Sequence, residues 1–220
     1  MHSNQKQSKL EIMQKSIILF LIVLLPFGMT GYAYPSKVLN DFSDSLNLDQ
    51  QVERLSVLFE MANETKADSS MEQFFEAFPS SFVMFEKIYG FLEGKPSPLY
   101  YESLEQVRLF WETESFVEKD IFMDKVIMIA MGGDWSADGV SFFQSGLMEY
   151  VDNYLSETVQ ILEKYEAEEV SSFWSFLFAG PCPPKTIPID IELVRSQNSA
   201  IAALAESAFS DARRGWFLPN

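Results

Sequence analysis

Apolar residues recur at spacings of three and four positions along most of the chain, which is the period of an amphipathic α-helix. Alternating apolar and polar positions, which would indicate strands, are nearly absent. The predicted helices span residues 48–62, 70–78, 79–89, 98–111, 115–131, 140–151, 159–165, 170–178 and 190–213. We therefore expect an all-α fold, a single compact and irregular bundle of roughly seven to nine helices without internal repeats.

Local signals predict where several helices begin. Ser69-x-x-Glu72 and Ser115-x-x-Glu118 are spaced as capping boxes, in which the two side chains satisfy free N–H groups of the first turn. Ser97 precedes a proline, the order of a cap followed by a first helical residue. Alanines are concentrated in the last predicted helix, so it can approach a neighbour closely.

The N-terminal residues have the order of a secretory signal. Lysines precede an unbroken apolar run at 17–25, and small residues stand before a potential cleavage point after Ala33. The run is shorter than the roughly 20 residues of a membrane span. We expect residues 1–33 to be a cleaved signal peptide, 34–47 a flexible arm and 48–220 one helical domain, periplasmic or secreted. Retention of the segment as an anchor is the alternative.

The histidine and cysteine content limits the chemistry of the mature chain. His2 is the one histidine and leaves with the signal, which excludes a catalytic imidazole and histidine-ligated zinc or copper. Cys182 is the one cysteine, which excludes an intramolecular disulfide and favours a structural role. We expect no catalytic residue, no metal site and no cofactor.

The charge is strongly negative. The chain has 16 basic and 32 acidic residues, and removal of 1–33 leaves 13 against 31, a net charge of −18. Nucleic acid and anionic membrane surfaces are poor partners for such a chain, because their phosphates repel it. A basic secreted protein is the natural complement, since opposite fields speed encounter. The alternative is that the acidity only maintains solubility.

Basic residues are scarce in the stretch 126–184, where Lys164 is the one basic residue against nine acids. We expect this stretch to form a partner-binding face. The candidate residues are Asp134, Asp138, Glu149, Asp152, Glu157, Glu166, Glu168 and Glu169.

One segment resembles half of a calcium-binding loop. Asp134-x-Ser136-x-Asp138-Gly139 matches the opening of an EF-hand, with oxygen ligands at alternating positions and glycine at the sixth. The match fails at Ser145, which stands where the bidentate glutamate is required. We therefore expect no tight calcium site, and we interpret Asp134 or Ser136 as the cap of the following helix.

Two further sets of residues have a chemical and a structural interpretation. Paired carboxylates can hydrolyse glycosides, yet adjacent glutamates between polar helix ends are typical of a solvated corner. Tryptophans can stack on sugars, yet most of these lie within or beside apolar helical patterns and are expected in the core. The first set is Glu163, Glu166, Glu168 and Glu169, and the second is Trp111, Trp135, Trp174 and Trp216.

Three patterns together resemble a known group of proteins. They are FxAFPxxFxxFxxxYG at 75–90, DWSAD at 134–138 and SFWxFLFxGP at 172–181. The combination is similar to that of uncharacterised all-helical proteins exported by Gram-negative bacteria, and the resemblance covers about residues 70–184. It implies a helical fold and transfers no site residue. The setting of that group resembles that of small periplasmic immunity proteins.

Export, a helical domain, the missing imidazole and the acidity together favour a binding protein. The leading hypothesis is an immunity or inhibitor protein that covers a cationic toxin or hydrolase and is not itself an enzyme. One alternative is a cell-wall hydrolase that uses carboxylates alone. The other is a non-catalytic accessory protein of the envelope with a groove for a small ligand.

Overall fold

The computed structural model describes residues 47–136, 138–181 and 184–217, all of which belong to one compact unit. Their secondary structure is almost entirely helical, which confirms the all-α fold. The helices are α3 (Leu48–Thr65), α4 (Asp68–Ala77), α5 (Phe82–Tyr89), α6 (Ser103–Glu112), η1 (Thr113–Phe116, a 3-10 helix), α7 (Lys119–Ala130), α8 (Gly139–Asn153), α9 (Leu155–Leu162), α10 (Ala167–Phe178), α11 (Ile191–Gln197) and α12 (Ser199–Phe217). The predicted signal peptide, most of the predicted arm, and Cys182 lie outside the described residues.

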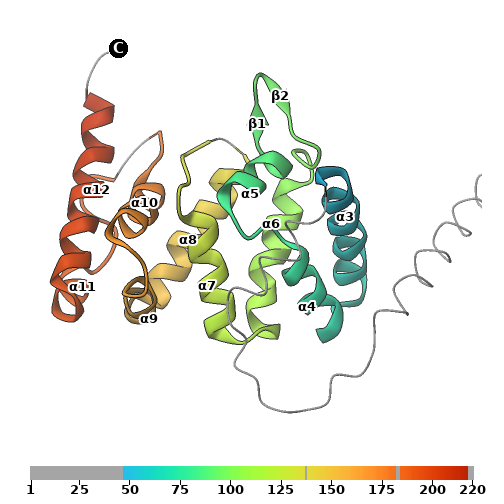
Figure 1. Ribbon diagram of the computed structural model, residues 1–220, viewed down its shortest axis with the longest axis horizontal. Coiled ribbons are helices and arrows are strands. Elements are labelled where there is room, and N and C mark those ends of the chain that lie inside the picture. The colour runs from blue at the N-terminus through green and yellow to red at the C-terminus, as the bar shows by residue number, and fades with distance from the viewer. Residues whose placement is uncertain (1–46, 137, 182–183, 218–220) are drawn as a thin grey trace, which may run out of the picture. The chain divides into compact units, whose positions relative to one another are not determined.

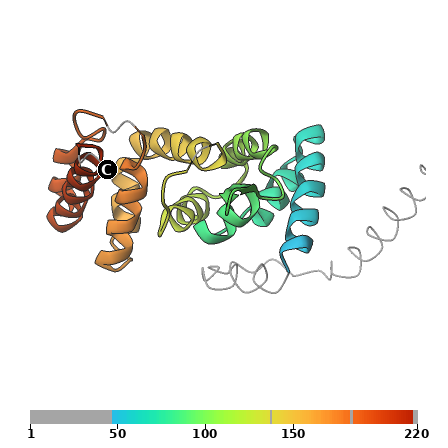
Figure 2. The same ribbon diagram turned by 90° about the horizontal axis from the view of Figure 1, so that it is seen from above.

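Figures 1 and 2 show α3 in blue at one end and α12 in red at the other, with α8 packed against α6 between them. The first helix illustrates how the sequence specifies them. Leu55, Leu58 and Ala62 recur at helical spacing and are buried. Asn47 and Gln50 form a capping box, in which Oδ1 of Asn47 accepts from the Gln50 backbone at 2.9 Å. Neighbouring helices also bury one apolar face, although α4 and α6 have no side-chain cap.

Several helix starts differ from the prediction because the expected serines do not cap them. Ser69 lies inside α4, which begins one residue earlier. Ser97 donates from Oγ to the carbonyl of Glu86 at 3.0 Å, and α6 begins only after a turn. Ser115 donates to the carbonyl of Glu112 at 3.2 Å within η1, so α7 begins after it. Capping-box spacing alone was therefore an unreliable guide here.

The last predicted helix, 190–213, is divided into α11 and α12 at Asn198. The backbone of Asn198 is extended, with φ −148° and ψ 106°. Its side-chain Oδ1 accepts from the backbone N–H groups of Ala200 and Ile201 at 3.0 and 3.2 Å. Asparagine is a strong N-terminal cap, so this residue ends one helix and starts the next.

Helix α12 packs on α10 through its alanines, as the sequence predicted. Small residues at spacings of three allow the two backbones to approach closely. The ring of Phe209 on α12 meets Phe178 on α10 edge to face, with centroids 5.6 Å apart. The buried alanines of α12 are Ala202, Ala205 and Ala208.

A small hairpin interrupts the helices where the sequence predicted a loop. β1 (Phe91–Leu92) pairs antiparallel with β2 (Lys95–Pro96), with Phe91 opposite Pro96. The turn residues Glu93 and Gly94 have positive φ values of 51° and 77°. Two positive φ values in succession are typical of the tightest hairpin turns, which match the twist of the strands.

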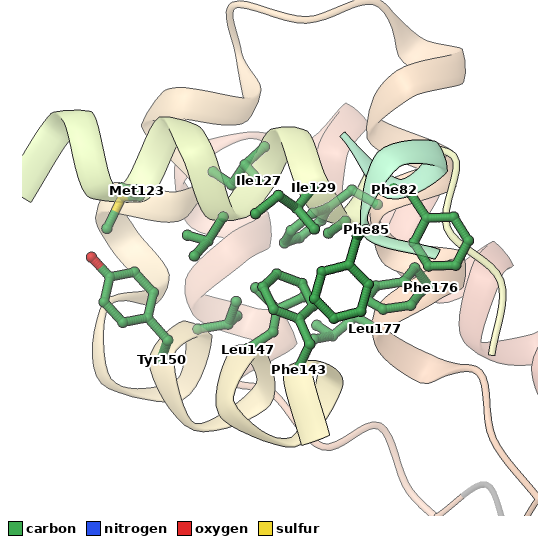
Figure 3. Close-up of a cluster of buried hydrophobic side chains, with 14 of the residues drawn as sticks. Phe82, Phe85, Met123, Ile127, Ile129, Phe143, Leu147, Tyr150, Phe176 and Leu177 are labelled. Carbon is green, nitrogen blue, oxygen red and sulfur yellow. The ribbon is translucent and has the colours of Figure 1, made fainter. Parts of the chain in front are cut away.

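The core is rich in phenylalanine. Phe78 of the α4–α5 link stacks on Phe110 of α6 with centroids 4.0 Å apart, and Phe110 lies 5.3 Å from Phe122 of α7. Figure 3 shows Phe143 of α8 beside Phe85 of α5, where the centroids are 5.2 Å apart. Burying each such ring contributes about 1.5–3 kcal/mol, so this cluster joins α4 to α8 firmly.

Candidate functional site

The eight predicted partner-binding acids fall into two groups in the structure. Two of the exposed ones, Glu149 and Asp152, lie one turn apart on α8, and neither has an ion-pair partner among the described residues. Asp134 is exposed and accepts only from the backbone N–H of its neighbour Trp135, at 2.8 Å. These three carboxylates are free to interact with a partner.

Glu157 has a partner within the chain. Its Oε1 accepts from Nζ of Lys119 at 2.7 Å, and this hydrogen bond lowers the pKa of the carboxyl group. The same ammonium group lies 3.8 Å from the ring centroid of Tyr154. The charge of Glu157 is therefore partly neutralised by an interaction that joins α7 to α9.

The glutamates at the start of α10 have a structural role. The backbone N–H of Glu166 donates to Oε2 of Glu169 at 3.0 Å, and the two residues form a capping box. Glu168 is also in the first turn, where negative charge is favourable beside the positive end of the helix dipole. Glu163 accepts from Nδ2 of Asn198 at 3.0 Å. Two of the four residues of this acidic cluster, Glu166 and Glu169, therefore cap α10.

Asp138 differs from the other acids because its backbone is strained. Its φ of 55° and ψ of −116° lie in a region of backbone conformation that only glycine adopts without strain. Its side chain does not cap α8, and neither Asp134 nor Ser136 does, so the predicted cap was wrong. The carboxylate instead accepts from the hydroxyl of Tyr100, and this hydrogen bond raises the pKa of the Tyr100 phenol.

Close packing fixes the position of Asp138. The next residue, Gly139, begins α8 directly against α5 and α6. A Cβ atom added there would lie 3.0 Å from Cβ of Ser103 and 3.1 Å from Cβ of Tyr89. Both contacts are tighter than side chains normally allow, so close packing holds the first residue of α8 in one position.

Tyr100 belongs to an exposed group of rings that the sequence reading missed. Its centroid is 5.6 Å from that of Phe91 on β1 and 5.2 Å from that of Tyr101, which it meets edge to face. Half of the surface of Phe91 and 80% of that of Tyr101 are exposed. We call Phe91, Tyr100 and Tyr101 the aromatic cluster. Tyrosine and phenylalanine rings are enriched at protein interfaces, and tyrosines often carry much of the binding energy.

The aromatic cluster had a signal in the sequence. Tyr100 and Tyr101 are consecutive large rings between a proline-rich turn and the next helix, and one helical face cannot bury both. The predicted helix 98–111 includes both tyrosines, although one face of it cannot bury them both. The structure leaves them in a turn before α6.

The tryptophans with described side chains lie mainly in the core. Trp174 is fully buried, and Trp111 packs against the core while staying partly exposed. Trp135 lies beside Gly180, where an added Cβ would be 3.8 Å from its ring. These placements match the expected packing role for Trp174 and Trp111.

The acidic side chains of the described residues do not gather into a metal-binding cluster. In these residues no three His, Cys, Asp or Glu side chains gather closely enough to hold an ion. The two aspartates of the partial EF-hand match have different partners. Asp134 accepts from the backbone N–H of Trp135, and Asp138 accepts from the hydroxyl of Tyr100. Glu168 lines a shallow surface groove with Ser171, Ser172 and the glycines that follow α7.

The comparisons with known proteins add no relative. No family model, no curated protein and no solved structure matches this chain. Among the described helices, none combines the length and the apolar composition that crossing a bilayer requires.

Proposed function

We propose that the protein is an exported, non-catalytic binding protein that covers a basic partner, in the manner of a periplasmic immunity or inhibitor protein. The observation that carries this proposal is the contact between the aromatic cluster and Asp138. It combines exposed rings, which supply binding energy, with a carboxylate that a cationic group can approach.

The acidic surface supports the same function. Glu149 and Asp152 carry charges that no described residue neutralises, and the stretch 126–184 has one lysine, which lies 3.9 Å from Asp124. Charges at the rim of an interface mainly raise the association rate, whereas central aromatic residues slow dissociation. The two sets of residues therefore have separable roles.

The hydrolase alternative has no comparable support. The acidic cluster around Glu166 and Glu169 is used for helix capping, and its residues surround no enclosed pocket among the described ones. An active site of this kind needs two carboxylates facing one another across a cleft.

The experiment begins with capture of partners from periplasmic extract by the purified mature protein, followed by identification of the bound protein. Surface plasmon resonance then compares the wild type with Tyr101→Ala, and with Met61→Ala as a matched control on α3, where Met61 is 45% exposed. We expect Tyr101→Ala to weaken binding about 30-fold through faster dissociation, because central rings carry about 2 kcal/mol or more. Met61→Ala is expected to bind as the wild type does.

Charge reversal tests the acidic rim separately. Glu149→Lys with Asp152→Lys is expected to slow association and to weaken its salt dependence, whereas Glu60→Lys on exposed α3 surface has a smaller effect. The proposal is wrong if the captured partner is acidic, or if Tyr101→Ala and the α8 reversal both leave the two rate constants unchanged.

A further inference from the structure

The ring of Tyr100 contacts both an exposed ring and a carboxylate. Its hydroxyl group donates to Oδ2 of Asp138, and its centroid lies 5.2 Å from that of Tyr101, with an angle of 86° between the two ring planes. Asp138 and Tyr101 therefore contact the same side chain, and no more than one ring separates them. Because Tyr101 is 80% exposed, its own ring is open to solvent.

The carboxylate of Asp138 has no cation to neutralise it in the described part of the chain. The ion pairs between described residues all involve other acids. The cation–ring contacts between described residues likewise involve rings outside the aromatic cluster. Asp138 is also partly exposed. A negative charge and an open ring thus lie together on the surface, and a cation from outside can approach both.

The chain fills a comparable site elsewhere with a cation of its own. Nζ of Lys119 lies 3.8 Å from the ring centroid of Tyr154 and 2.7 Å from Oε1 of Glu157, so one ammonium group contacts a tyrosine ring and a carboxylate together. An aromatic face attracts a cation electrostatically, and a neighbouring carboxylate adds a charged hydrogen bond. We expect Tyr101 and Asp138 to attract a cation for the same reason.

The carboxylate of Asp138 is held in place before a ligand arrives. The hydroxyl of Tyr100 donates to one of its oxygens, and the close approach of Gly139 to Ser103 and Tyr89 holds the adjacent backbone. A site whose groups are already in position loses less conformational entropy when a ligand binds.

We propose that Tyr101 and Asp138 bind the guanidinium group of an arginine side chain of the basic partner, an inference that rests on the proposed function. The planar group stacks on the ring of Tyr101, while N–H groups at its edge donate to the carboxylate of Asp138. Arginine suits these two contacts better than lysine, because guanidinium is planar, is weakly hydrated and presents its donors in one plane. Tyr100 acts as a positioning residue for the carboxylate.

The test is a titration of the purified protein with N-acetyl-L-arginine methylamide, at constant ionic strength maintained with sodium chloride. The ring signals of Tyr100 and Tyr101 are followed by ¹H–¹³C NMR. We expect saturable shifts of these signals with the arginine probe and weaker binding of the corresponding lysine probe. The citrulline probe, which has the shape of arginine without its charge, is expected to give no saturable shift.

Two variants test the two contacts separately. Asp138→Asn keeps an acceptor for the Tyr100 hydroxyl but removes the charge, and is expected to weaken binding of the arginine probe about tenfold or more. Tyr101→Leu keeps an apolar side chain but removes the ring, and is expected to weaken it about threefold. Asp68→Asn, at an exposed aspartate of α4, is the matched control and should bind as the wild type does. Circular dichroism establishes that each variant is folded.

The outcomes separate this inference from the proposed function. A saturable response that Asp138→Asn weakens supports the arginine site even if no basic partner is captured, a result that counts against the proposed function alone. Capture of a basic partner whose binding Tyr101→Ala weakens, without a saturable response to the arginine probe, supports the proposed function and overturns the arginine site. Equal binding of the arginine and lysine probes, or undiminished binding by folded Asp138→Asn, also overturns it.

Discussion

Gly146 of α8 lies directly against the indole ring of Trp111. A Cβ atom added at Gly146 would overlap Nε1 of Trp111 and would lie 2.8 Å from its Cδ1. The ring cannot move aside easily, because it packs on Phe122 and Phe143 with centroids 5.8 and 5.5 Å away. Glycine is therefore required inside this helix for steric reasons.

We expect Gly146→Ala to destabilise the protein by about 1–3 kcal/mol, because overpacking exceeds the gain of about 1 kcal/mol from helix propensity. Urea denaturation measures the change. Ser145→Ala, at the exposed neighbouring position, is the control and should change stability little. In a Trp111→Phe background the cost of Gly146→Ala should fall, and an unchanged cost would show that the ring is not its cause.

A second prediction concerns the buried hydrogen bond between Tyr89 and Gln106. The hydroxyl of Tyr89 donates to Oε1 of Gln106 at 2.7 Å, and Gln106 is only 1% exposed. Tyr89→Phe leaves this oxygen unpaired, so we expect a loss of about 1–3 kcal/mol in the free energy of unfolding. Tyr101→Phe, at an exposed ring, should cost almost nothing. Equal effects of the two changes would contradict the role of the buried pair.

The backbone of Asp138 predicts an inverted order of stability. At most positions alanine is more stable than glycine, but a φ of 55° with ψ of −116° favours glycine. We expect Asp138→Gly to be more stable than Asp138→Ala by about 1 kcal/mol or more in thermal or urea unfolding. Both variants lose the bond to Tyr100, so both should bind a partner less tightly. If Asp138→Ala is the more stable variant, the backbone of Asp138 is not strained.

Lys125 predicts a pH dependence of stability. Its folded-state pKa is about 7 against an ordinary value of 10.5, so between these values the unfolded state binds more protons. Stability therefore rises with pH in this window and carries the full cost of the buried charge below it. Relative to Lys125→Met, the wild type should gain up to about 1.4 kcal/mol per pH unit above pH 7. If the free energies of unfolding of the wild type and Lys125→Met change in parallel from pH 6 to 10, the pKa of Lys125 is not lowered.

The N-terminal sequence predicts processing during export. The lysine-rich start, the apolar run at 17–25 and the small residues before Ala33 favour cleavage after Ala33. N-terminal sequencing of protein from the periplasm should begin at Tyr34. A retained start at Met1 would instead support the anchor interpretation.

Much of the fold followed from the sequence because burial imposes a helical period. Residues such as Leu55, Phe143 and Trp174 stand at that period and are fully buried. Helix ends were harder, since Ser97 and Ser115 resemble caps but bond to carbonyl groups of preceding segments. Such choices depend on three-dimensional neighbours.

The candidate site was predicted only in part. Asp138 was selected for its charge, but its partner Tyr100 lies 38 positions earlier, and no local pattern joins them. The small cavity lined by Arg54 and Ser81 has no sequence signal either, because its wall forms only when α3 and α5 pack. The net charge can be read from the composition, whereas the positions of rings and cavities beside the charged groups depend on how the helices pack.

The shortness of the hairpin has a consequence for the behaviour of the protein at high concentration. Each strand has two residues, and Pro96 removes one backbone donor from β2, so this edge is a poor template for a strand from another molecule. The chain contains 20 phenylalanines, a composition that would aggregate readily as extended strands. In the described residues these rings are carried mainly by helices, whose backbone groups are satisfied internally. Aggregation should therefore begin from unfolded chains, and additives that favour the folded state should suppress it.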